Sequence, residues 1–161
     1  MSAISNLSAV DLLKLHASVA GELRARGITR SSNNPTGDLA EYLFCQAFGW
    51  KQSTNSNVGF DAIAADGTRY QIKGRRRIRH RESRQLGAIR KFTEGNFDVL
   101  AGVLFNEDYT ISRAALIPYV TVKERAKFIA HTNSHKFMLR DDVWQAEGVK
   151  DVTEQLRAVA L

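Results

Sequence analysis

The sequence is poor in the features that mark secreted, membrane or zinc-binding proteins. Its 161 residues include a single cysteine, Cys45, so no disulfide can form within the chain, and no Cys/His cluster has the spacing of a zinc site. The longest apolar runs, such as VLAGVLF at 99–105, fall far short of the roughly 18 residues of a membrane span. The N-terminus also lacks the charged-then-apolar pattern of a signal peptide. These absences favour a cytoplasmic protein with no membrane partner.

Several kinds of catalytic machinery are missing as well. No glycine-rich phosphate loop and no Ser/His/Asp set can be assembled, which excludes kinase-like enzymes and triad hydrolases and leaves no site for an organic cofactor. No internal repeat or low-complexity tract appears. With 43% hydrophobic and 25% charged residues, the chain fits one soluble domain spanning 1–161.

Apolar periodicity predicts an α/β domain with a mixed central sheet flanked by helices. Helices are expected at 8–27, 39–48, 122–130 and 141–160, the last interrupted near Gly148. Strands are expected on both sides of the Asp66-Gly67 turn, with Gly74 ending the second, and at 97–105, 109–120 and 136–140. The basic segment 75–94 is expected to be partly helical. We expect a core at 37–118 and a helical extension at 1–30.

The positive charge is concentrated in one segment. Residues 73–91 carry nine Lys or Arg against one Glu, a net charge of +8, so the rest of the chain carries −2. Such a patch directly after a strand offers a footprint for a polyphosphate backbone, whereas the alternative is a solvated helix face or a flexible basic loop. The residues expected to bind nucleic acid are Arg75, Arg76, Arg77, Arg79, Arg81 and Arg84.

Glu41 lies on a helix that is apolar nearly all round. Its neighbours at helical spacing are Phe44, Cys45 and Phe48. A carboxylate there costs several kcal/mol unless it is paired, protonated or held against a cation. Glu41 is therefore either a site residue or half of a structural salt bridge to an arginine.

The hairpin around Asp66-Gly67 predicts a second polar group. If ADG forms a three-residue loop with Gly67 left-handed, Asp61 faces Gln71, and Lys73 shares that side of the sheet. A two-residue turn would instead place Asp61 opposite Ile72 and scatter the group. In the first register, Asp61, Gln71 and Lys73 converge, and Glu41 on its buried helix is a candidate fourth member. Two carboxylates and an amide or main-chain carbonyl offer hard oxygen ligands for Mg²⁺, and Lys73 can orient or deprotonate a water. Phosphodiester hydrolysis needs these parts together with basic residues for the flanking phosphates.

GDLAEYLFCQAF, followed by GFDAI, a turn and YQIKGR, resembles the PD-(D/E)XK nuclease superfamily, in particular small bacterial members with a Gln-X-Lys triplet. The resemblance implies a restriction-endonuclease-like fold and a site made of Glu41, Asp61, Gln71 and Lys73. Asp61 would be a direct ligand of Mg²⁺, or of Mn²⁺ as a substitute. Gln71 and the main-chain carbonyl of Ile72 would be secondary ligands, Glu41 a ligand directly or through water, and Lys73 the water-activating group.

The function implied is a metal-dependent endonuclease acting on DNA, in restriction, defence or repair. Cutting both strands with one site per chain would favour a homodimer. The alternatives are a catalytically inactive nucleic-acid-binding module of the same fold, or a nuclease acting on RNA. Gln71 stands where an acid is commonest in this family. A glutamine there resembles restriction enzymes that act on modified DNA, and it should weaken metal binding.

The remaining candidates point to ordinary structural roles. His131 and His135 have the spacing of helical metal ligands, but no third ligand accompanies them, so we expect surface histidines. Trp50, Trp144 and the phenylalanines are expected in the core rather than stacked on bases.

Overall fold

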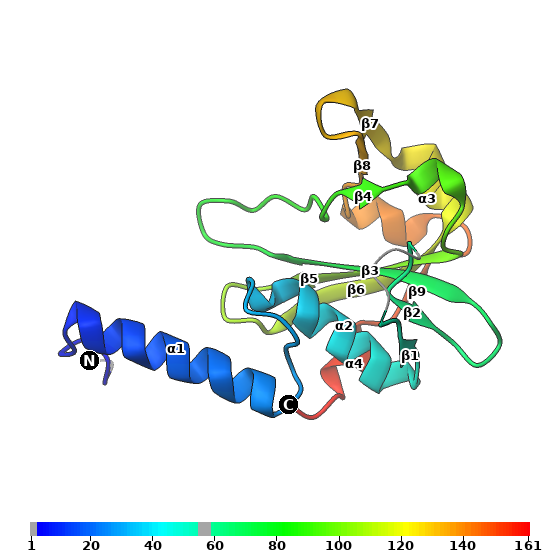
Figure 1. Ribbon diagram of the computed structural model, residues 1–161. Helices are drawn as coiled ribbons and strands as arrows, with labels where there is room; N and C mark the ends of the chain where they lie inside the picture. The colour runs from blue at the N-terminus through cyan, green and yellow to red at the C-terminus, as the bar shows by residue number, and fades with distance from the viewer. Residues whose placement is uncertain (1–2, 55–58) are drawn as a thin grey trace.

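A mixed six-stranded sheet forms the centre of the fold (Figure 1). The computed structural model describes residues 3–54 and 59–161. In spatial order the strands are β1 (Lys51–Gln52), β2 (Ala62–Ile63), β3 (Arg69–Arg76), β5 (Val99–Phe105), β6 (Ile111–Pro118) and β9 (Lys150–Asp151). The β3–β5 pair is parallel and the other neighbours are antiparallel, which confirms the expected mixed α/β fold.

The central strand β5 is covered on both faces. Ala101, Val103 and Phe105 pack with helix α2 (Pro35–Phe48) and the short helix α4 (Thr153–Arg157). On the other face, Leu100 and Leu104 belong to a second apolar cluster. This cluster includes Val122 of helix α3 (Tyr119–Arg125) and Ile89 of β4 (Ile89–Arg90). Strand β4 belongs to a second, three-stranded sheet with β8 (Ser134–Lys136) and β7 (Lys127–Ile129). The uninterrupted apolar run predicted this double burial.

The hairpin has the predicted register. Ala62 pairs with Tyr70 and Ile63 with Arg69, and the Ala64 N–H donates to the Thr68 carbonyl at 2.9 Å. Gly67 has a φ of +88°, the left-handed conformation that the three-residue loop requires. Asp61 is therefore set opposite Gln71, as predicted.

Gly74 does not end β3, contrary to expectation. A Cβ at this position would lie 3.0 Å from the Ala40 Cβ and 3.2 Å from the Phe105 ring. The glycine thus lets α2 approach the strand closely, and β3 continues to Arg76. The interior glycine marks close packing rather than a strand end.

Helix α1 (Ala9–Ala25) forms the predicted extension and projects away from the sheet in Figure 1. The Ser8 side chain caps it by accepting from the Asp11 N–H at 3.2 Å. None of its seventeen residues, all of them described, is buried. In the described part of the chain, no helix is both long and apolar enough to cross a membrane.

Helix α2 begins at Pro35, four residues before the predicted start. The Asn34 side chain caps it by accepting from the Thr36 N–H at 3.1 Å, and a proline fits the first helical turn. Its predicted end is correct, because Gly49 is left-handed at φ +67°.

Other boundaries differ because short strands carry little periodicity. The helix predicted at 122–130 is replaced by α3 and β7, and the strand predicted at 136–140 by β8. Within 75–94 lie the end of β3, β4 and one 3-10 turn, η1 (Phe92–Glu94), without an α-helix. The terminal region contains η3 (Asp141–Gln145), β9 and α4, and η2 (Ala130–Thr132) links β7 to β8.

Candidate active site

Three of the four predicted site residues meet in one cavity. Asp61, Gln71 and Lys73 line a space of about 410 Å³. The other lining residues are Gly59, Phe60, Ala88, Arg90 and Lys91. Gln71 and Lys73 are two apart on β3 and so project from the same face, while residues 88–91 approach from the second sheet. The cavity is thus enclosed by the predicted hairpin and by a segment around β4.

The Asp61 carboxylate is held in place by hydrogen bonds to one oxygen. Its Oδ2 accepts from the Gln71 Nε2 at 2.5 Å and from the Ile72 backbone N–H at 2.6 Å. The backbone N–H of Asp61 also donates to the Tyr70 carbonyl at 2.8 Å. Both of these side-chain hydrogen bonds are made by Oδ2, so, among the described residues, Oδ1 remains available to a further donor or to a cation.

The Ile72 carbonyl points toward the Asp61 side of β3. The N–H and C=O of one strand residue point to the same edge, and the Ile72 N–H already reaches Asp61. The Gln71 amide nitrogen is turned to Asp61, so its oxygen remains available as an acceptor.

These oxygens are chemically suited to Mg²⁺. Asp61 Oδ1, the Ile72 carbonyl and the Gln71 amide oxygen are hard ligands, and Mg²⁺ in proteins is commonly held by one or two carboxylates with several waters. Within residues 3–54 and 59–161, no cluster of three or more His, Cys, Asp or Glu side chains is placed to hold a metal. The donor set therefore fits a weakly held Mg²⁺ that keeps much of its water shell.

Burial disfavours the negative charge on Asp61. Burial raises the pKa of Asp61 above its ordinary value, against the opposing effects of the Ile72 N–H, the Lys73 charge and the Gln71 amide. A divalent cation at Oδ1 would stabilise the ionised form.

Glu41 does not line this cavity. Its Oε2 accepts from the Arg30 Nη2 at 2.5 Å and from the Gln52 Nε2 at 2.6 Å. Burial and the nearby Asp61 charge raise the pKa of Glu41, although Gln52 and Arg30 oppose the shift. The structure thus shows Glu41 in a salt bridge with Arg30, which was one of the two roles that the sequence allowed.

Arg30 and Gln52 are the partners of Glu41, and the sequence did not reveal either of them. The Arg30 and Ser31 backbone N–H groups donate to Asp38 Oδ2 at 2.9 and 2.8 Å, which fixes the turn before α2. That turn carries the Arg30 guanidinium to Glu41. The sequence held one sign of this contact: a buried Glu41 needs a cation nearby. It did not indicate which residue supplies that cation.

The predicted arginine patch is divided between two faces of the sheet. Alternation along β3 places Arg75 on the side of Lys73 and Arg76 on the opposite side. Arg76 stacks over the Tyr109 ring at 4.5 Å and donates from Nε to the Glu107 carbonyl at 2.7 Å. Arg76 therefore lies on the face of the sheet opposite Lys73.

The other arginines of the patch differ in how far they are engaged. Arg77 pairs with Glu82 at 3.5 Å and Arg84 with Asp141 at 2.5 Å. Arg79 and Arg81 are exposed, and neither forms an ion pair within the described residues. Arg90 and Lys91, which were counted in the basic segment but not as binding residues, line the cavity instead.

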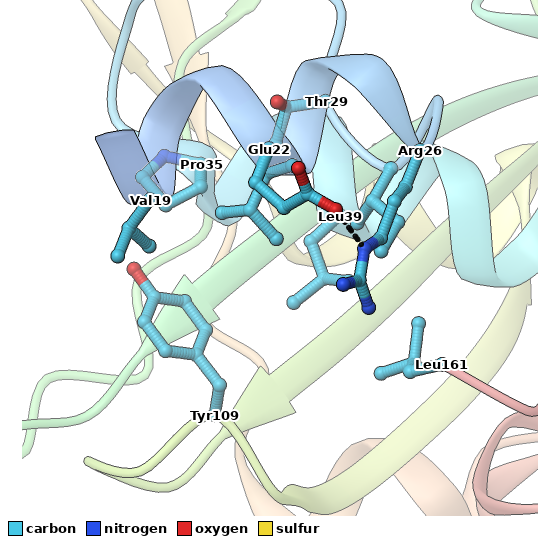
Figure 2. A pocket seen from close by; sticks show the side chains of 10 residues that line it. Val19, Glu22, Arg26, Thr29, Pro35, Leu39, Tyr109 and Leu161 are labelled. Carbon is cyan, nitrogen blue, oxygen red and sulfur yellow. Dashed lines mark hydrogen bonds and ion pairs between the residues drawn. The ribbon is translucent and has the colours of Figure 1, made fainter. Parts of the chain in front are cut away.

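A second, apolar cavity of about 470 Å³ lies where α1 meets the body of the protein (Figure 2). Val19, Leu39, Tyr109 and Leu161 contribute to its walls, and Glu22 and Arg26 form an ion pair beside it at 2.8 Å. It shares no lining residue with the Asp61 cavity.

Comparison with known proteins gives no family assignment. No protein-family model matches the sequence, and no curated protein is significantly similar to it. The resemblance to PD-(D/E)XK nucleases therefore stays a prediction based on Glu41, Asp61, Gln71 and Lys73.

Proposed function

We propose that this protein is a cytoplasmic, Mg²⁺-dependent endonuclease with a restriction-endonuclease-like active site that hydrolyses DNA. The observation that carries the proposal is the convergence of Asp61, Gln71 and Lys73 in one cavity that also contains Arg90 and Lys91. A carboxylate, an amide, an amine and two further cations are the groups that metal-assisted phosphodiester hydrolysis uses.

Each residue has a distinct role in this proposal. Asp61 Oδ1 would hold the metal together with the Ile72 carbonyl and the Gln71 amide oxygen. When bound, Mg²⁺ supplies positive charge beside the phosphate as negative charge develops there. Lys73 would orient the attacking water beside the phosphate.

The basic residues near the cavity would hold the nucleic acid backbone. Arg90 and Lys91 lie in the cavity wall, and Arg75 follows Lys73 on the same face of β3. Phosphate contacts of this kind give affinity that falls with salt and does not depend on sequence. Cleavage of both strands would bring two copies of the chain together, so we propose a homodimer on DNA.

One observation favours a second candidate, a binding module without catalysis. Glu41 is paired with Arg30 and Gln52 and does not line the cavity. Asp61 is the only carboxylate among the described residues that line it. A site with so little negative charge could bind DNA and hold metal too weakly for turnover.

Purified protein incubated with supercoiled plasmid, single-stranded DNA and RNA, in Mg²⁺, Mn²⁺ or EDTA, tests the proposal. We expect DNA cleavage in either metal, none in EDTA, and none by Asp61→Asn. This variant keeps an oxygen to accept from Gln71 and Ile72, so its fold should survive. DNA binding without cleavage in any divalent metal would select the inactive module, and cleavage of RNA alone would overturn DNA as the substrate.

A further inference from the structure

Phe128 is unusually exposed for a phenylalanine. Its side chain lies on β7 of the second sheet and is 54% exposed, and it is the only aromatic residue among the large exposed apolar side chains of the described chain. The expectation that the phenylalanines lie in the core is wrong at this position. A single exposed apolar side chain is ordinary on a protein surface, so the case for a ligand rests on what surrounds this ring.

The Phe128 ring is held in place by other rings. His135 is its cross-strand partner, with the ring centroids 5.2 Å apart, and the His135 ring lies 4.8 Å from that of the buried Phe92. This series of rings connects the surface to the core. A ring fixed in this way loses little conformational freedom when a ligand stacks on it.

A cavity of about 730 Å³ lies beside this ring series. Phe128, His135 and Phe92 contribute to it, together with Asn133 and Thr132. Arg90 and Lys91 line both this cavity and the one that contains Asp61. The two cavities are therefore neighbours on either side of the same two cations.

The chemistry of the second cavity suits a base better than a phosphate. Glu94 is also in its wall and would repel a phosphate, but its carboxylate can accept a hydrogen bond from the exocyclic amine of a base. Phe128 offers a face for stacking, and Asn133 offers an amide for the edge of the base. A DNA strand that occupied both cavities would carry its phosphates past Arg90 and Lys91.

We infer that this cavity binds an unpaired base of the DNA strand whose phosphate enters the Asp61 cavity, with Phe128 stacked on the base. The inference rests on the proposed function, because the same strand must occupy both cavities. A base within a continuous duplex is stacked on both faces and cannot reach Phe128. The preferred substrate would therefore carry a single-stranded tail, a bulge or an extruded nucleotide.

Equilibrium binding in EDTA tests this subsite separately from cleavage. The probes are a fluorescein-labelled blunt duplex, the same duplex with a short dA tail, and the same duplex with an abasic tail. Loss of one stacked base should weaken binding of Phe128→Ala to the dA-tailed probe by about 5- to 150-fold. Binding to the blunt and abasic probes should not change. Phe128→Trp should bind the dA tail at least as well as the wild type.

Val120→Ala is the matched control. Val120 is 59% exposed and lines neither cavity, so its loss should affect none of the probes. Equal losses on all three probes, or no loss on the dA tail, would overturn the subsite. A fourth probe, the same duplex with an RNA tail of the same sequence, separates DNA from RNA. A loss of binding confined to this probe would also overturn the subsite. If Phe128→Ala behaves as expected but no metal supports cleavage, the nuclease proposal fails while the subsite stands.

Discussion

Replacing Arg30 with methionine removes the cation that compensates Glu41. Methionine keeps an unbranched stem but cannot donate to Glu41, which then retains Gln52 as its donor among the described residues. The substitution therefore leaves a largely buried carboxylate without its ion pair.

The loss of stability caused by Arg30→Met depends on how exposed the Arg30–Glu41 ion pair is. The Glu41 side chain is 17% exposed and that of Arg30 is 47% exposed. Fully exposed pairs contribute up to about 1 kcal/mol, whereas breaking a buried pair costs about 3–5 kcal/mol. For this intermediate case, we expect Arg30→Met to lower the free energy of unfolding by about 1–3 kcal/mol near neutral pH.

The loss should depend on pH in a defined direction. Burial and the Asp61 charge raise the pKa of Glu41, so its ionisation already opposes folding, and stability falls as pH rises through this pKa. Without Arg30 the pKa of Glu41 rises further, so the ionisation of Glu41 lowers the free energy of unfolding by a larger amount. The difference between wild type and variant should thus be small near about pH 4, where Glu41 is mostly protonated, and largest near about pH 8.

Urea denaturation followed by circular dichroism at both pH values measures this difference. Arg26→Met is the matched control, because Arg26, at the C-terminal end of α1, pairs with Glu22 at 2.8 Å, and both side chains are more than half exposed. The control should cost at most about 0.5 kcal/mol at either pH. The reasoning is refuted if Arg30→Met costs no more than the control, or costs the same at pH 4 and pH 8.

Three further substitutions test other parts of the structure. Gln71→Glu would place a carboxylate against Asp61 Oδ2, so thermal melts should show lower stability without metal and a larger gain from Mg²⁺ than in the wild type. Gly74→Ala should lower the free energy of unfolding in urea by about 1–3 kcal/mol, because its Cβ would overpack helix α2. Arg75→Gln should reduce the salt dependence of DNA binding by up to about one unit of slope, whereas Arg76→Gln, on the opposite face, should leave the slope unchanged.

The hairpin and the central strand could be predicted because local rules determine them. A left-handed Gly67 selects the loop, the loop sets the register, and the register brings Asp61 to Gln71. The apolar run at 99–105 likewise required burial on both faces. In both cases the signal lies in neighbouring residues.

The second sheet and the Arg30 contact could not be predicted because they depend on long-range packing. The strands β4, β7 and β8 are two or three residues long, too short for a period to be read. Their sheet brings Arg90 and Lys91 to the Asp61 cavity and Phe128 to the neighbouring cavity. In the sequence, the arginines of residues 73–91 form one run of positive charge. In the sheet, side-chain alternation along β3 places Arg76 on the face opposite Lys73.

The rate of plasmid nicking by Lys73→Met tests whether the Asp61 cavity is the active site. Lys73 lies in the cavity beside Asp61, and a positioned acid or base contributes roughly 10²- to 10⁴-fold to such reactions. We predict nicking in Mg²⁺ slowed at least about 100-fold with DNA binding retained, while Lys14→Met, which removes the same charge from α1, nicks at the wild-type rate. Equal nicking rates for Lys73→Met and Lys14→Met would contradict the assignment of the Asp61 cavity as the active site.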